Sequence, residues 1–81
     1  DAAPLMDDAL EAAVLAQRAR KATGLSQTAF AERFGLRAET IRDWEAGRHD
    51  PGDVGRALLT IIHQNPATSL AACRAAHGAD V

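Results

Sequence analysis

The stretch GLSQTAFAERFGLRAETIRDWEAGRHDP, residues 24–51, holds two short segments whose apolar residues recur at helical spacing. Gly35 separates the two segments, and Gly47 stands where the second one would stop. The stretch therefore predicts two short helices, about 27–34 and 37–46, joined by a tight turn. The side chains expected to face a shared interior are Phe30, Ala31, Phe34, Leu36, Ile41 and Trp44.

A helix, a short turn containing glycine and a second helix make the pattern of a helix-turn-helix, in which the second helix reads DNA. The formal net charge of −2 is low for a nucleic-acid-binding chain. The charge is unevenly distributed, however, because residues 18–48 hold seven Lys or Arg against four Asp or Glu. The basic excess thus coincides with the predicted motif, where phosphates would lie.

The rest of the 81 residues is rich in alanine and poor in aromatic residues, which favours thin, closely packed helices. We expect further helices at about 5–23, 53–64 and 67–76, giving an all-α fold of five helices in one domain. Residues 1–19 would form the acidic N-terminal extension and first helix, 20–66 the core motif, and 67–81 the C-terminal helix and tail. The residues expected at helix ends are Asp7 or Asp8, Ser26, Asp53, Asn65–Pro66 and Gly78.

Several other classes of protein find no support in the sequence. The single cysteine, Cys73, cannot form an internal disulfide, and no apolar run is long enough to span a membrane, which predicts a cytoplasmic protein. Cys73 and His77 are four residues apart, but two ligands do not make a metal site, and His49 and His63 have no matching partner. We find no catalytic constellation and expect no enzyme, metal or cofactor.

The residues GLSQ, FA, FGL, TI, DWE and GRH of this stretch, with Pro51, resemble the Cro/cI-like (XRE) helix-turn-helix family of lambdoid phage repressors. The resemblance runs from about Arg20 to Pro66 and implies a lambda-repressor-like DNA-binding domain acting at the bacterial nucleoid. The segments WEAGRHDP and LLTIIHQNP are similar to those of HigA-type antitoxins. Such antitoxins repress their own operon and bind a ribonuclease toxin.

The resemblance also implies roles for individual residues. In the family, the N-terminal part of the second motif helix faces base edges, and the first helix begins with a glutamine that contacts a phosphate. Arginine can donate two hydrogen bonds to guanine, alanine can touch a thymine methyl and glutamate can accept from cytosine. By motif position, the base-facing candidates are Arg37, Ala38, Glu39, Arg42 and Asp43, and the phosphate candidates are Gln27, Thr40 and Arg48.

The family further places an ion pair between the first helix and the reading helix, at the positions of Arg20 and Glu45. Both residues have predicted core residues as neighbours and carry opposite charges. If the pair is buried, removing one partner should destabilise the fold by about 3–5 kcal/mol.

The resulting hypothesis is a repressor that binds a palindromic operator as a homodimer, with half-sites about 34 Å apart. We expect the dimer contact in the C-terminal region, Leu58 to Ala76. The acidic residues within 1–17 belong to a solvated helix face or complement a small basic toxin. Two alternatives stay open: a stand-alone transcription regulator without a toxin, and a protein-interaction adaptor that keeps the fold without reading DNA.

Overall fold

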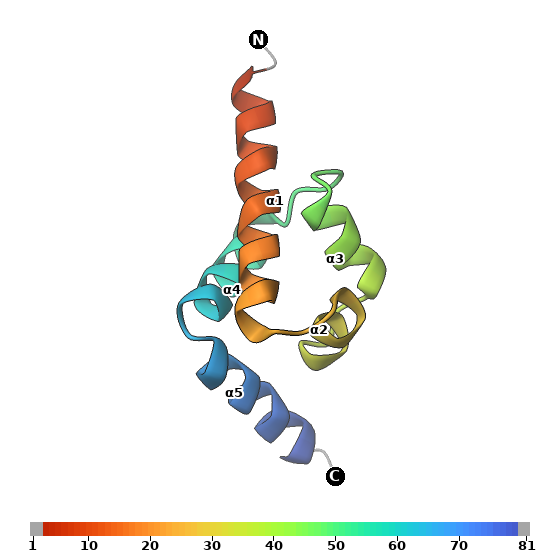
Figure 1. The fold of residues 1–81 in the computed structure, drawn as a ribbon, viewed down its shortest axis with the longest axis vertical. Helices are drawn as coiled ribbons and strands as arrows, with labels where there is room; N and C mark the ends of the chain where they lie inside the picture. Colours follow the sequence, from red (N-terminus) through yellow and green to blue (C-terminus); the bar gives the residue numbers. More distant parts are fainter. Residues whose placement is uncertain (1–2, 80–81) are drawn as a thin grey trace.

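The computed structural model describes residues 3–79, with side-chain surroundings for residues 10–73. This part of the chain is all-α, without strands, and measures 50 × 23 × 21 Å. Figure 1 shows that α1 and α5 extend toward opposite ends of the long axis. The five helices are α1 (Ala3–Thr23), α2 (Gln27–Arg33), α3 (Ala38–Glu45), α4 (Gly52–Gln64) and α5 (Pro66–Ala79).

Helix α1 is the scaffold of the fold and packs against each of the other helices. Its inner face is built from small side chains, because the residues buried there are alanines. Their short side chains allow the neighbouring helices to approach closely. The alanines buried on this face are Ala12, Ala13, Ala16 and Ala19.

The centre of the core lies where α2, α3 and α4 meet α1. Phe30 and Ile41 are fully buried there, as predicted, and α4 adds Leu59 and Ile62. The other predicted core residues, Phe34, Leu36 and Trp44, are only half-buried and pack against the edge of the core. Phe34 is the C-cap residue of α2, Leu36 lies in the turn and Trp44 is next to the last residue of α3.

The turn between α2 and α3 depends on Gly35, whose φ of +72° lies in the left-handed region that favours glycine. The chain reverses there, and the amide of Leu36 donates to the carbonyl oxygen of Ala31 at 2.7 Å. At the start of α2, the Ser26 hydroxyl accepts a hydrogen bond from the Ala29 amide at 3.1 Å, so the predicted N-cap is confirmed. These local bonds fix the angle at which α3 leaves α2.

Three predicted helix ends are wrong. Helix α1 begins at Ala3, so Asp7 and Asp8 lie inside it, and α5 passes through Gly78, since one glycine lowers helix stability by only about 1 kcal/mol. Helix α4 begins before Asp53, with Gly52, whose amide donates to the Asp50 carboxylate at 2.8 Å. Hydrogen bonds from Arg56 and from this amide lower the pKa of Asp50.

Candidate nucleic-acid interface

Helix α3 has one inward and one outward face. Ile41 is buried against the core, and Ala38 and Trp44 pack partly against it. Glu39 and Arg42 point the opposite way and are exposed. Figure 1 shows α3 at one side of the molecule, with α1 on its inner side. The outward face of α3 is therefore open to a macromolecular partner.

The exposed charged side chains at the beginning and middle of α3 are unpaired within the described part of the chain. Arg37, Glu39 and Arg42 make no side-chain hydrogen bond or ion pair with any residue in the described part of the chain. An arginine without a protein partner keeps all its N–H donors available for a ligand. Arg37 lies at the N-cap position and Arg42 about one turn further along, so both guanidinium groups extend from the same short helix.

A shallow hollow of about 180 Å³ lies beside these residues. Its lining brings together several of the predicted interface residues with two others, since Trp44 and the exposed His49 also contribute. His49 was not among the interface residues predicted from the sequence, although His49 directly follows Arg48 in the GRH segment. The lining consists of Arg37, Glu39, Thr40, Asp43, Trp44 and His49.

Two predicted interface residues pair with each other at the C-terminal end of α3. The Arg48 guanidinium lies 2.9 Å from the Asp43 carboxylate, and its Nε donates to the same oxygen at 3.0 Å. The Arg48 amide also donates to the Asp43 carbonyl oxygen at 2.9 Å. The loop after α3 is therefore folded back onto the helix. Arg48 remains well exposed, so its outer N–H groups stay accessible.

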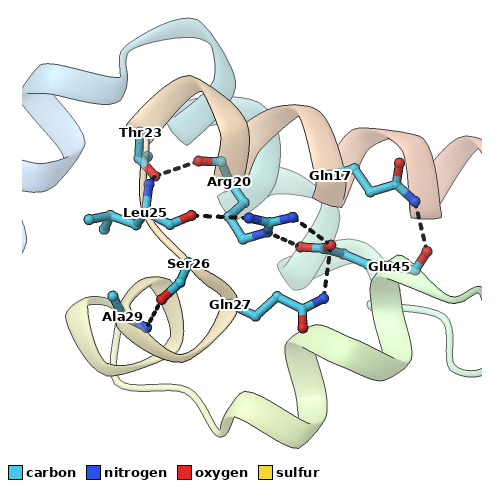
Figure 2. A network of polar contacts seen from close by, with 8 residues as sticks. All are labelled: Gln17, Arg20, Thr23, Leu25, Ser26, Gln27, Ala29 and Glu45. Atoms are coloured by element: carbon cyan, nitrogen blue, oxygen red, sulfur yellow. Dashed lines mark hydrogen bonds and ion pairs between the residues drawn. The ribbon is translucent and has the colours of Figure 1, made fainter.

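The polar network behind α3 is centred on Glu45 (Figure 2). Arg20 from α1 contacts both carboxylate oxygens, with Nε at 2.6 Å from Oε2 and Nη2 at 3.2 Å from Oε1. Gln27 from α2 donates its amide to Oε1 at 3.1 Å. Gln17 donates to the Glu45 carbonyl oxygen at 2.9 Å, which ties α1 to the end of α3 a second time.

This network is largely shielded from solvent, because the side chain of Arg20 is 19% exposed and that of Glu45 only 7%. The hydrogen bond with Glu45 raises the pKa of Arg20, so the guanidinium stays charged. Arg20 also donates to the Leu25 carbonyl oxygen at 3.1 Å in the loop before α2. The network thus joins α1, α2 and α3 and sets the direction of α3.

The other residues predicted at the interface, Gln27, Ala38 and Thr40, are half-buried. Gln27 is the first residue of α2, as the phosphate contact requires, but its amide nitrogen is already bound to Glu45. Thr40 lies in the wall of the hollow and Ala38 packs against the edge of the core.

No group of three or more metal-ligating side chains occurs among the residues that the structure describes. No helix in that part of the chain is both long and apolar enough to cross a bilayer.

The five-helix arrangement with its α2–turn–α3 unit defines a helix-turn-helix domain. Residues 17–53 match the protein-family model described as Helix-turn-helix. The match begins in α1 with Gln17, spans the complete α2–turn–α3 unit and ends in the first turn of α4. The predicted fold class is therefore confirmed. No curated protein and no solved structure matches the chain.

Proposed function

We propose that this chain is a sequence-specific DNA-binding transcriptional repressor that places α3 in the major groove. One observation carries the proposal: α3 presents Arg37 and Arg42 outward, without protein partners, on a helix held rigidly from behind. The major groove of B-DNA admits one α-helix, and arginine pairs with the O6 and N7 atoms of guanine there. A rigid support keeps such side chains in register with the bases.

The two ends of the α2–α3 unit would bind the DNA backbone. Arg48 is exposed at one end, and the N-terminus of α2 lies at the other with Gln27 as its first residue. Helix N-termini and arginines are common phosphate donors and fix the register of a protein on the duplex. Thr40 would contribute a hydroxyl from the wall of the hollow. Ala38, Glu39 and Asp43 would complete the surface that meets the bases.

Repression would follow from occupancy of an operator by a homodimer. One α3 helix contacts only a few base pairs, so a single domain has limited specificity. A two-fold dimer reads two half-sites about 34 Å apart and binds them cooperatively.

Replacing Arg42 by alanine tests the DNA-reading role. We expect Arg42→Ala to weaken binding to the DNA sequence that the wild type prefers by about 1–3 kcal/mol, which is roughly 5- to 150-fold. A gel-shift assay at moderate salt measures the change. Arg56→Ala is the matched control, since it removes the same charge from α4, outside the α2–α3 unit. If the two variants bind equally well, Arg42 does not read the DNA and the proposed placement of α3 is wrong. If the wild-type protein binds no DNA sequence preferentially, the chain is an adaptor rather than a repressor.

We further propose that the chain is the antitoxin of a type II toxin–antitoxin module. The resemblance to HigA-type antitoxins supports this proposal, as do the four acidic residues and the absence of Lys or Arg within residues 1–17. A ribonuclease must attract RNA and is therefore basic, so an acidic segment complements it. Autorepression of the operon would then respond to toxin occupancy.

Co-expression tests the antitoxin proposal. The small basic protein encoded next to this chain should arrest growth alone and be neutralised when the chain is present. The two proteins should also co-purify as a complex. If the neighbouring gene product is harmless or does not bind, the chain is a stand-alone transcription regulator, and the DNA-reading proposal is unaffected.

A further inference from the structure

The face of α1 that points away from the core carries two exposed apolar residues among charged ones. Leu10 is 60% exposed and Val14 is 38% exposed. Glu11, Arg18 and Lys21 are exposed on the same face, opposite the buried alanines. We call these five residues the α1 ridge. Two neighbouring exposed apolar side chains rimmed by charged residues are a candidate contact surface.

The ridge lies between two hollows of similar size. One measures about 340 Å³ and lies on the α4 side, where His63 forms part of the wall together with Leu15 and Arg18. The other measures about 350 Å³ and lies toward the end of α3, where Ala46 and Gly47 form part of the wall. Leu10 and Val14 line both. A ridge between two grooves is the shape that another helix surface interlocks with.

The charges on the ridge are arranged in a self-complementary order. Glu11 and Arg18 lie on either side of Val14 and Leu15, at equal sequence distances from their midpoint. Neither charged side chain makes a hydrogen bond or ion pair within the described residues. The acidic residues of this helix belong to its N-terminal half and the basic ones to its C-terminal end. An antiparallel copy of the same helix would therefore bring the acidic half of one helix next to the basic end of the other.

We propose that the α1 ridge binds a second copy of this chain, with the two α1 helices antiparallel about a two-fold axis between Val14 and Leu15. Glu11 of each copy then faces Arg18 of the other, and Leu10 enters a hollow of the second copy. A contact of this kind is isologous, because the same patch serves both subunits. The inference rests on the proposed homodimer and replaces the C-terminal region as its contact.

The arrangement is compatible with DNA binding. A two-fold axis that relates antiparallel helices runs at right angles to both of them. Figure 1 shows α3 to one side of α1 and α4 behind α1. If the two-fold axis points from α1 toward the side on which α3 lies, the α3 helices of both subunits lie on the same side of the dimer. One duplex can then contact both of them.

Charge reversal in the full chain tests the contact. Sedimentation velocity over a concentration series should show a monomer–dimer equilibrium for the wild type. Glu11→Arg and Arg18→Glu should each weaken dimerisation by about tenfold or more, because like charges then face each other twice in every dimer. The double variant Glu11→Arg/Arg18→Glu restores opposite charges and should dimerise nearly as well as the wild type.

Ile61→Asp is the matched control, since it places a charge at an exposed apolar residue of α4, outside the α1 ridge. This variant should dimerise like the wild type. The inference is overturned if Ile61→Asp dissociates the dimer while the charge reversals do not, or if the double variant fails to recover. It is also overturned if the wild type stays monomeric, or if the reversals abolish binding of a basic partner protein but spare the dimer.

A second readout separates this inference from the proposed function. Binding to a DNA fragment with one half-site needs only one α3 helix, so the charge-reversal variants should bind it like the wild type. If dimerisation is unchanged and half-site binding is intact, only the α1 contact is wrong. If neither the wild type nor any of the variants binds the half-site fragment, the DNA-reading proposal is wrong as well. Thermal melts confirm that each variant is folded.

Discussion

Glu45 is the residue at which α1, α2 and α3 are joined. Its carboxylate accepts hydrogen bonds from Arg20 and Gln27, and its backbone carbonyl accepts one from Gln17. A planar guanidinium matches both oxygens of a carboxylate, which a lysine ammonium does not. The pair therefore determines the orientation of α3 as well as its attachment.

Replacing Glu45 by alanine should destabilise the protein by about 3 kcal/mol, at the lower end for buried pairs because Arg20 keeps some contact with water. The loss arises from leaving the guanidinium and the Gln27 amide without an acceptor. Urea denaturation followed by circular dichroism measures it. Glu39→Ala is the control on the same helix and should change stability by less than about 0.5 kcal/mol. Equal stability of the two variants would contradict a structural role for the network.

Side-chain pairing was the feature that the sequence could least predict. Opposite charge and neighbouring core residues led to the Arg20–Glu45 prediction, but the same reasoning did not pair Asp43 with Arg48. Nor did it anticipate that the Gln27 amide binds Glu45. Several partners lie within reach of a long side chain, and the backbone geometry of the folded protein selects among them. Local sequence patterns do not contain that information.

At the scale of the helices, the sequence predicted the number of helices and the position of the central turn. Helical spacing and glycine act locally, so both can be recognised without knowing the tertiary structure. The ends of α1, α4 and α5 were placed less well, because aspartate and glycine also occur inside helices and do not by themselves mark a helix end. The exposure of Leu10 on α1 was also missed, since periodicity does not show which apolar residues lack a covering element.

Gly35 in the α2–α3 turn offers a test at this scale. Gly35→Ala should destabilise the domain by about 1–2 kcal/mol, because an L-residue with a side chain is disfavoured at a φ of +72°. No atom lies within 4 Å of the added Cβ, so the effect is one of backbone conformation alone. Each kcal/mol lowers the melting temperature by roughly 4–8 °C in a domain of this size.

Gly35→Asn is the matched comparison, since asparagine tolerates the left-handed region better than alanine does. Its melting temperature should lie between those of the wild type and Gly35→Ala. An alanine variant that melts like the wild type would show that the turn is not held in this conformation. Equal melting temperatures of the alanine and asparagine variants would show that a feature other than the left-handed backbone conformation determines the loss of stability.

For the whole molecule, the charge distribution matters more than the total. The formal net charge of −2 would repel DNA if it were spread evenly. Instead the exposed Arg37, Arg42 and Arg48 belong to α3 and the residues that flank it, whereas residues 1–17 contain four acidic residues and no Lys or Arg. The antiparallel α1 pairing proposed above would also place each acidic half against a basic end. A dimer can thus neutralise its acidic segments and present the exposed arginines of two α3 helices on one side.

Selection of bound sequences from random duplex DNA, with the wild type and the variants Arg37→Ala and Arg42→Ala, tests the central claim most directly. The account predicts that the wild type enriches a two-fold symmetric motif with half-site centres about 10 base pairs apart. Each variant should keep the spacing but lose the preference at its own base position, which differs between the two. Enrichment of no motif by the wild type, or retention of the complete motif by both variants, would contradict reading by α3.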